Sequence, residues 1–518
     1  MRILFICPNR WSLGVGYLSA CLENAGHKTE AIVDPTLFGD NQILTISYLD
    51  KMFSYQDVIL DEIKRKDIDL VGFTVFHDNF EWACGLASKI KKIKNIPTIF
   101  GGVHPTLMPQ EVIQELSVDM VCIGEGEEAI VELADSMERG KIDYTIGSMW
   151  FKNNGRIIRN PVRPLLQDIN ALPFWNRDIF LDWCPVAKKI YATITARHCP
   201  FSCSYCVNPS LKKIYAGKGE FLRRRNPSNV IAELKLAKEK YGIKEVLFYD
   251  QNFNYDVHWL ERFSPLYKKE INLPFFCFVY PNIDEKSVHL LKSAGCQSVN
   301  LGIESVYEAT RNEVLHRYTP TEKIIETIRY LNEAGIYISA NVIFGLPLQT
   351  EQEKIDTVKF FIENKVDLPN ICWLRYYPNS EIFHFAKEKQ LLAREQIEAI
   401  EKGTHGGGVS RGDTFEKKYT NLHNFVTLSN IMPKKVSYQI LQRRYYRFFP
   451  PIPPIILKFV VSRLFSPLIN RLGNKKNTPL QEMSYFQFYS YFILKKMFYN
   501  LKVLLHKKRR YYGSDSEK

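Results

Sequence analysis

The chain has 518 residues, of which 45% are hydrophobic and 24% charged, and its formal net charge is +13. This length is too great for one small core and this composition excludes a disordered chain, so we expect two or three globular domains. The positive charge is concentrated in residues 416–518, where 20 Lys and Arg stand against 4 Asp and Glu. A charge confined to this region excludes a nucleic-acid groove in the core and favours an anionic surface as the region's partner.

The eleven cysteines are mostly scattered along the chain. The first residues predict a strand that Pro8 ends after an apolar run too short for a secretory signal. We therefore expect a cytoplasmic protein with reduced thiols.

Strand-like and helical runs alternate in the first domain, residues 1–145. The expected strands lie at 2–7, 28–33, 70–76, 98–100 and 120–123, and the expected helices at 13–25, 55–66 and 79–93. This alternation predicts a doubly wound, Rossmann-like parallel sheet. Ligands of such sheets lie beyond the carboxyl ends of the strands. The segments expected there are 8–16, 74–78, 101–106 and 124–127.

Two glycine-containing loops at that edge, Gly101-Gly-Val-His-Pro-Thr106 and Gly124-Glu-Gly-Glu127, resemble those of a cobalamin-binding domain. The resemblance implies bound cobalamin, and the residues that it assigns to cofactor binding are Thr74, Gly101, Gly102, Gly124, Glu125 and Gly126. The loop after the first strand lacks the D-x-H-x-x-G motif that supplies a histidine to cobalt in other cobalamin proteins. His77 is the only nearby substitute, and its alternative role is to cap its own loop. A retained fold without the cofactor is the other alternative.

Residues 146–189 contain four prolines and show little periodicity, so we expect a linker there. Strand and helix alternate again in residues 190–400. The expected strands are 190–195, 245–249, 275–280, 298–303, 338–344 and 371–375. Six such units predict a partial (β/α)6 barrel of the TIM type, with its functional site at the carboxyl ends of the strands.

The first of these strands leads to Cys199, Cys203 and Cys206, spaced C-x3-C-x2-C, with Tyr205 before the third cysteine. Three thiolates can hold three irons of a four-iron cluster and leave the fourth iron open to another ligand. Zinc or free thiols are the alternative. A structural zinc site needs a fourth ligand, which His198 supplies poorly because it is adjacent to Cys199.

The cysteine motif resembles that of the radical S-adenosylmethionine (radical SAM) superfamily, in which SAM binds the open iron and is cleaved to a 5′-deoxyadenosyl radical. The resemblance implies cofactor contacts from polar residues and a glycine at the strand ends of the barrel. These residues are Tyr205, Asp250, Gln251, Asn252, Glu304, Ser305, Asn341 and Gly345. Local roles, such as helix caps and tight turns, are the alternative for each of them.

Residues 401–518 are expected to form a mostly helical, basic and aromatic region. The glycine-rich segment Gly403–Gly408 is expected to form a loop over the active site. The aromatic segment 485–505, followed by the basic cluster Lys507–Tyr512, suits a helix in a bilayer interface. A helical cap on the barrel is the alternative. Prolines interrupt the apolar segment 448–465, so we expect no membrane span there.

The two resemblances together imply an enzyme that performs cobalamin-dependent methylation of an unactivated carbon on a small-molecule or lipid-like substrate. An external donor such as flavodoxin or ferredoxin would supply electrons. A radical cyclisation, carbon–carbon coupling or rearrangement without methyl transfer is the first alternative. A non-catalytic, membrane-associated corrinoid or nucleotide sensor with a structural cluster is an alternative of another class. The expected location is cytoplasmic, with peripheral contact at the inner face of the membrane.

Overall fold

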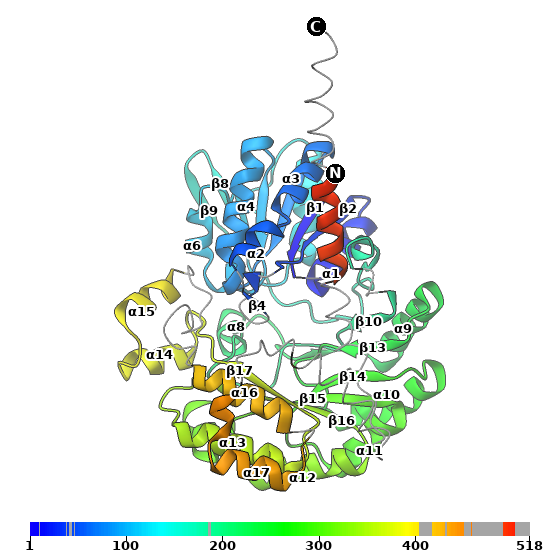
Figure 1. Ribbon diagram of the computed structural model, residues 1–518. Coiled ribbons are helices and arrows are strands. Elements are labelled where there is room, and N and C mark those ends of the chain that lie inside the picture. Colours follow the sequence, from blue (N-terminus) through cyan, green and yellow to red (C-terminus); the bar gives the residue numbers. More distant parts are fainter. Residues whose placement is uncertain are drawn as a thin grey trace, which may run out of the picture.

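The computed structural model describes residues 1–9, 11–37, 39–40, 44–45, 47–184, 188–402, 417–429, 432–449, 457 and 490–502. In Figure 1 a first domain, blue to cyan, lies over an open barrel, green to yellow. The expected loop Gly403–Gly408 and the basic cluster Lys507–Tyr512 lie outside the described residues.

The first sheet has seven strands in the order β2-β1-β5-β6-β7-β8-β9. They are β1 (Arg2–Pro8), β2 (Lys28–Asp34), β5 (Leu70–Thr74), β6 (Thr98–Gly101), β7 (Met120–Cys122), β8 (Met149–Asn153) and β9 (Arg156–Arg159). The first five are parallel, which confirms the doubly wound sheet. Strand β1 is apolar and buried from Ile3 to Cys7, as expected for a strand that is covered on both faces.

Helices surround this sheet and position its loops. They are α1 (Leu13–Asn24), α3 (Gln56–Arg65), α4 (Phe80–Ile93), α5 (Val103–Leu107), α6 (Pro109–Gln114) and α7 (Glu127–Glu138). Three short elements, β3 (Gly39–Asp40), β4 (Leu44–Thr45) and α2 (Ser47–Met52), lie between β2 and α3. Helix α1 begins after Ser12, whose Oγ accepts a hydrogen bond from the Val15 N–H at 3.3 Å.

The first sheet continues past residue 145, the expected end of its domain. Strands β8 and β9 pair antiparallel to each other, and β8 pairs antiparallel to β7. The turn between them contains Asn154 and Gly155, both with positive φ, as in a tight hairpin. The expected linker therefore begins only after Arg159.

The second sheet is the expected partial barrel. Its six parallel strands follow chain order: β10 (Ile190–Thr193), β13 (Glu245–Phe248), β14 (Phe275–Val279), β15 (Cys296–Glu304), β16 (Tyr337–Phe344) and β17 (Leu368–Trp373). The connecting helices are α9 (Pro227–Tyr241), α10 (Val257–Glu270), α11 (Glu285–Ala294), α12 (Thr321–Glu333) and α13 (Glu351–Asn364). Helix α8 (Asn208–Ile214) and the small hairpin of β11 (Ala196–Arg197) and β12 (Arg223–Arg224) flank the cysteine segment. Helices α14 (Glu381–Glu388) and α15 (Arg394–Glu401) follow β17.

The described residues after the barrel are mostly helical and pack on both domains. Helices α16 (Lys417–Ser429) and α17 (Lys434–Gln442) lie against the barrel near α13, with Phe425 and Val426 fully buried. A further helix at residues 490–502, red in Figure 1, lies against the first domain. In the described part of the chain, no helix combines the length and the apolar character that a membrane crossing requires.

Candidate active site at the domain interface

The three cysteines lie in a loop that neighbouring segments hold in place. The Ser204 N–H donates to the Leu315 carbonyl at 3.1 Å, and the Cys206 N–H donates to the Cys203 carbonyl at 3.1 Å. Across the described residues, no three His, Cys, Asp or Glu side chains converge on a single metal ion. A four-iron cluster does not need such convergence, because each cysteine binds a different iron.

Two side chains direct N–H groups at the cysteine sulfurs. Arg317 Nη1 lies 3.6 Å from Cys203 Sγ, and Asn208 Nδ2 lies 3.5 Å from Cys206 Sγ. Burial raises the pKa of Cys203, and the positive charge of Arg317 opposes that rise. A cation and N–H donors beside thiols favour the thiolate form that binds iron.

Arg317 also joins the cysteine loop, through Tyr205, to the end of β15, where Glu304 lies. Its Nη1 donates to Tyr205 Oη at 3.3 Å and its Nη2 to the Gly302 carbonyl. Its guanidinium carbon lies 4.2 Å from the centre of the Tyr280 ring. Burial raises the pKa of Glu304, although Arg317 and Tyr205 act to lower it. Sequence reasoning missed Arg317, which lies in the segment after the short π-helix at Thr310–Val314.

The three polar residues after β13 accept hydrogen bonds from other residues of the chain. They are Asp250, Gln251 and Asn252. Both oxygens of Asp250 accept the Thr195 N–H at 3.0 Å, and one of them accepts Thr195 Oγ1 at 2.6 Å. Gln251 Oε1 accepts from Asn208, and Asn252 Oδ1 accepts the Asn254 N–H at 3.2 Å. Because Asp250 is only 1% exposed and engaged by Thr195, the structure gives it the role of supporting the segment before the cysteines. Its predicted contact with SAM stays a prediction.

The remaining barrel candidates lie near the ends of β15 and β16. Ser305 Oγ accepts the Tyr307 N–H at 3.2 Å. Asn341 exchanges side-chain hydrogen bonds with Asn300 on the neighbouring strand, at 2.8 and 3.3 Å. Gly345 has φ +77°, and a Cβ there would lie 3.3 Å from the Trp373 ring, so this turn favours glycine. The fold thus brings Ser305 and Gly345 to the predicted edge, whereas Asn341 lies inside β16. The cofactor contacts of all three stay predictions.

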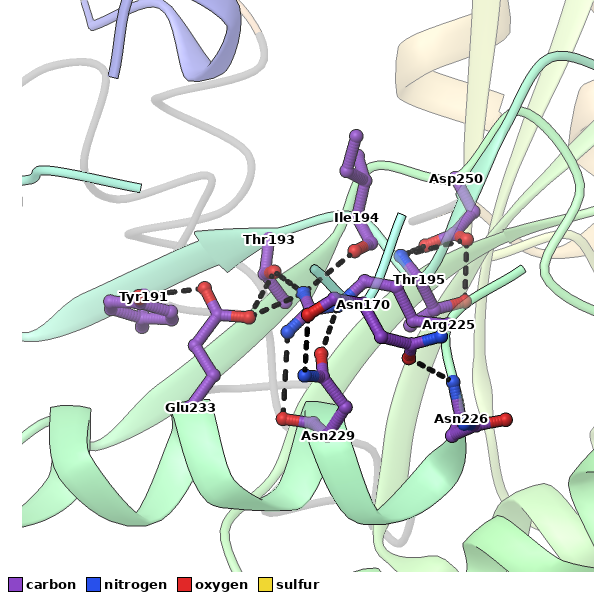
Figure 2. Close-up of polar contacts among 10 residues, drawn as sticks. All are labelled: Asn170, Tyr191, Thr193, Ile194, Thr195, Arg225, Asn226, Asn229, Glu233 and Asp250. Carbon is purple, nitrogen blue, oxygen red and sulfur yellow. Dashed lines mark hydrogen bonds and ion pairs between the residues drawn. The ribbon is translucent and has the colours of Figure 1, made fainter. Parts of the chain in front are cut away.

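A buried ion pair supports the strand that leads into the cysteine loop (Figure 2). Glu233 accepts from Tyr191 Oη at 2.8 Å, from Thr193 Oγ1 at 3.1 Å and from Arg225 Nη1 at 2.5 Å. Arg225 Nη1 also donates to the Ile194 carbonyl at 3.2 Å. Both charged side chains are at most 5% exposed. No local sequence pattern predicts this pair, which holds the end of β10 in place.

A second group of charges joins the two domains beside the cysteines. Glu125, from the loop after β7, lies 2.7 Å from Arg223 Nη2 and 2.9 Å from Arg197 Nη1. Glu127 also pairs with Arg197, two residues before Cys199. Burial alone would raise the pKa of Glu125, but Arg223 and Arg197 lower it to about 2. The Gly124–Glu127 loop is therefore bound by arginines of the barrel.

The glutamine variant Glu125→Gln should make stability less sensitive to acid. Because the pKa of Glu125 falls from 4.5 to about 2 in the fold, its ion pairs stabilise the protein above pH 4.5. That contribution, about 3 kcal/mol, is lost as the pH falls towards 2. Urea unfolding at a series of pH values should therefore show a shallower acid loss in the variant. The control is Glu239→Gln, at an exposed site. If wild type, Glu125→Gln and this control all lost the same stability in acid, the ion pairs of Glu125 would not be the source of that stability.

The other loops at the edge of the first sheet carry the predicted corrinoid residues. Thr74 and Gly101 are partners in register at the ends of β5 and β6. Gly102 has φ +109°, and a Cβ there would meet the Val75 carbonyl oxygen at 2.9 Å. At Gly124 a Cβ would lie 1.8 Å from Tyr215 Oη of the barrel, so this glycine admits a side chain of the other domain. At Gly126 a Cβ would lie 3.1 Å from Cys122 Sγ.

A histidine pair lies near the same edge. Nδ1 of His77 and Nδ1 of His104 are 3.2 Å apart, and both residues are buried. Burial lowers the pKa of His104 to about 3, with a further contribution from His77. The His77 ring lies 6.1 Å from the ring of Tyr377, just after β17 of the barrel. The pair thus faces the barrel across the domain interface.

Two family models match the sequence in the regions just described. The model described as the Radical SAM superfamily matches residues 193–361, and the model described as the B12 binding domain matches residues 11–134. Residues 193–361 are thus a radical SAM domain, and residues 11–134 are a B12-binding domain. The protein is an enzyme, and its cofactors are a 4Fe–4S cluster, SAM and cobalamin.

Three comparisons show how far the likeness extends. An uncharacterized methyltransferase of Pyrococcus horikoshii is 26% identical over 79% of this chain and 85% of its own length. An anaerobic magnesium-protoporphyrin IX monomethyl ester cyclase of Rubrivivax gelatinosus is 23% identical over 82% of this chain and 77% of its own. The solved structure of the cobalamin-dependent SAM radical enzyme OxsB has a TM-score of 0.63 at 13% identity. That match covers 98% of this chain and 81% of the OxsB chain and shows a shared fold.

The residues of this radical SAM enzyme fit these cofactors. Near the cysteines, Arg317 Nε and Asn208 Oδ1 are buried and lack a hydrogen-bond partner among the described residues. At the edge of the first sheet, His104 Nε2 is likewise buried without a partner in the described part of the chain. Buried polar atoms without partners are costly, so each can pair with a polar group of a bound cofactor.

Proposed function

We propose that this enzyme methylates an unactivated carbon of a small-molecule or lipid-like substrate held between its two domains. The contact of Glu125 with Arg197 and Arg223 is the observation that supports this most directly. It places a loop of the B12-binding domain beside the cysteine loop of the barrel. A second interdomain ion pair, Asp78 with Arg375, joins the ends of β5 and β17. A substrate bound between these edges would be within reach of both cofactor sites.

The chain's own residues would bind the cofactors, orient them and shield the site from water. Cys199, Cys203 and Cys206 would hold the cluster, and Arg317 and Asn208 would donate hydrogen bonds to their sulfurs. Glu304 and Arg317 offer a carboxylate and a guanidinium for the polar groups of SAM. Bound to these sites, the cofactors would supply a radical that abstracts hydrogen from carbon and a methyl group that replaces it. The aromatic rings of Phe201 and Tyr280, stacked with centroids 3.9 Å apart, would help to exclude water.

The relatives' names support methyl transfer and also a second candidate. The Pyrococcus relative is called a methyltransferase, whereas the Rubrivivax relative is called a cyclase. A radical cyclisation, coupling or rearrangement without methyl transfer is therefore the alternative. The experiment below must distinguish it from methyl transfer. Both reactions need an external electron donor, such as flavodoxin or ferredoxin, and a reducing cytoplasmic setting suits the eleven free cysteines.

The test uses full-length protein purified without oxygen after expression with hydroxocobalamin and reconstituted with iron. Stoichiometric corrinoid beside about four irons would support the proposal. So would transfer of a deuterated methyl group from labelled SAM to a substrate, read by mass spectrometry. Four irons and formation of 5′-deoxyadenosine without corrinoid or methyl transfer would overturn methylation in favour of the alternative. Absence of SAM cleavage would overturn the proposed function.

A further inference from the structure

One face of the helix at residues 490–502 binds the first domain. Phe492 is fully buried, and Tyr55 Oη donates to its carbonyl at 2.6 Å. The rings of Tyr55 and Phe492 meet edge to face, with centroids 5.3 Å apart. Lys496, which is 2% exposed, pairs with Asp57 on α3. These contacts fix the orientation of the helix on the domain.

The opposite face presents a stripe of large apolar side chains to solvent. Its members are 52% to 65% exposed. They are Leu494, Met497, Phe498 and Leu501. Their spacing of three, four and seven residues places them on one side of a helix. A contiguous apolar patch of this kind marks a binding surface in soluble proteins, whereas single exposed apolar residues are ordinary. Among the described residues, it is the other face and a flank of this helix that contact the rest of the chain.

Positive charge dominates the sequence around the stripe. Lys502 belongs to the same helix, and Lys507 to Arg510 follow it in the sequence. Lys495 is already engaged, because its Nζ lies 4.1 Å from the centre of the Trp183 ring. Residues 416–518 as a whole carry 20 Lys and Arg against 4 Asp and Glu. An apolar stripe bordered by cations complements a surface with an apolar interior and negative headgroups.

We propose that the helix at 490–502 docks the enzyme on an anionic lipid surface. The stripe enters the boundary between headgroups and acyl chains, while Lys502 contacts lipid phosphates. Because one face of the helix is fixed to the first domain and the opposite face carries the stripe, the helix would lie in the plane of the bilayer. The contacts of Phe492 and Lys496 keep the first domain on that surface. The proposal rests on residues separate from the active site and stands independently of the reaction.

Vesicle sedimentation of the full-length protein tests the proposal. We expect it to sediment with vesicles that contain phosphatidylglycerol and to remain in solution with phosphatidylcholine alone. Binding should weaken as salt is raised, because screening weakens the charge attraction. The double variant Leu494→Gln, Phe498→Gln should lower the partition coefficient by at least about tenfold, since each removed side chain contributes about 1.5–3 kcal/mol when buried.

The matched control is Leu116→Gln, Leu236→Gln, which removes two exposed leucines elsewhere on the surface. It should bind vesicles as the wild type does, and both variants should keep the wild-type iron content and SAM cleavage. Equal binding by all three proteins would overturn the assignment to the stripe. Failure of the wild type to bind anionic vesicles would overturn the proposal. A dimer in solution that only the stripe variant loses would assign this face to a second copy of the chain.

Discussion

The alanine variant Cys203→Ala is expected to lose the iron–sulfur cluster and all detectable cleavage of SAM. Cys203 is 7% exposed and accepts an N–H from Arg317, so its thiol lies in a buried site beside a cation, as expected for a cluster ligand. A cubane with two of its three cysteine ligands is no longer held at the open-iron geometry that binds SAM. Iron and sulfide content should fall well below the wild-type value, and formation of 5′-deoxyadenosine should fall by at least about a thousandfold, or about 4 kcal/mol in barrier.

The control for this variant is Cys84→Ala, which removes a thiol from α4 in the first domain. It should keep its iron, its sulfide and its SAM cleavage. Wild-type turnover in Cys203→Ala would contradict the assignment of the cluster. An equal loss in both variants would mean that general instability, and not ligand removal, causes the effect.

Sequence reasoning predicted those parts of the molecule that local patterns encode. The spacing of Cys199, Cys203 and Cys206 is such a pattern, and so is the alternation that predicted both parallel sheets. Glu304 lies at the end of β15 as expected, because strand ends follow from the apolar run that precedes them. The hairpin of β8 and β9 was missed although Asn154-Gly155 is a strong turn signal. Because prolines follow this turn, residues 146–189 were predicted as a linker throughout.

Long-range partners could not be predicted. Arg317 meets Cys203 across 114 positions, and Arg223 meets Glu125 across 98. Nothing in the local sequence distinguishes these arginines from solvated ones. The resemblance of its loop to that of a cobalamin-binding domain assigns Gly124 to a corrinoid contact. The structure shows that Tyr215 of the barrel closely approaches this glycine. Whether a corrinoid also contacts this loop stays a prediction.

The methionine variant Arg225→Met is expected to destabilise the barrel by about 3–5 kcal/mol, because it leaves the carboxylate of Glu233 buried without its cation. That carboxylate is fully buried, and Tyr191 and Thr193 can supply only neutral hydrogen bonds. The midpoint of urea unfolding should fall accordingly. Since Arg225 also holds the Ile194 carbonyl at the end of β10, iron incorporation in the following loop should fall as well.

The double variant Arg225→Met, Glu233→Leu separates a charge effect from a packing effect. No unpaired charge remains buried in it, so it should regain more than half of the lost stability, less about 1 kcal/mol for each hydrogen bond that Tyr191 and Thr193 lose. The matched surface pair Arg329 and Glu333 on α12 is more than half exposed. Its variant Arg329→Met, Glu333→Leu should change stability by less than about 1 kcal/mol. If Arg225→Met and the double variant were equally unstable, packing of the arginine side chain would be responsible. In that case the ion pair would not be what holds the strand beneath the cysteine loop.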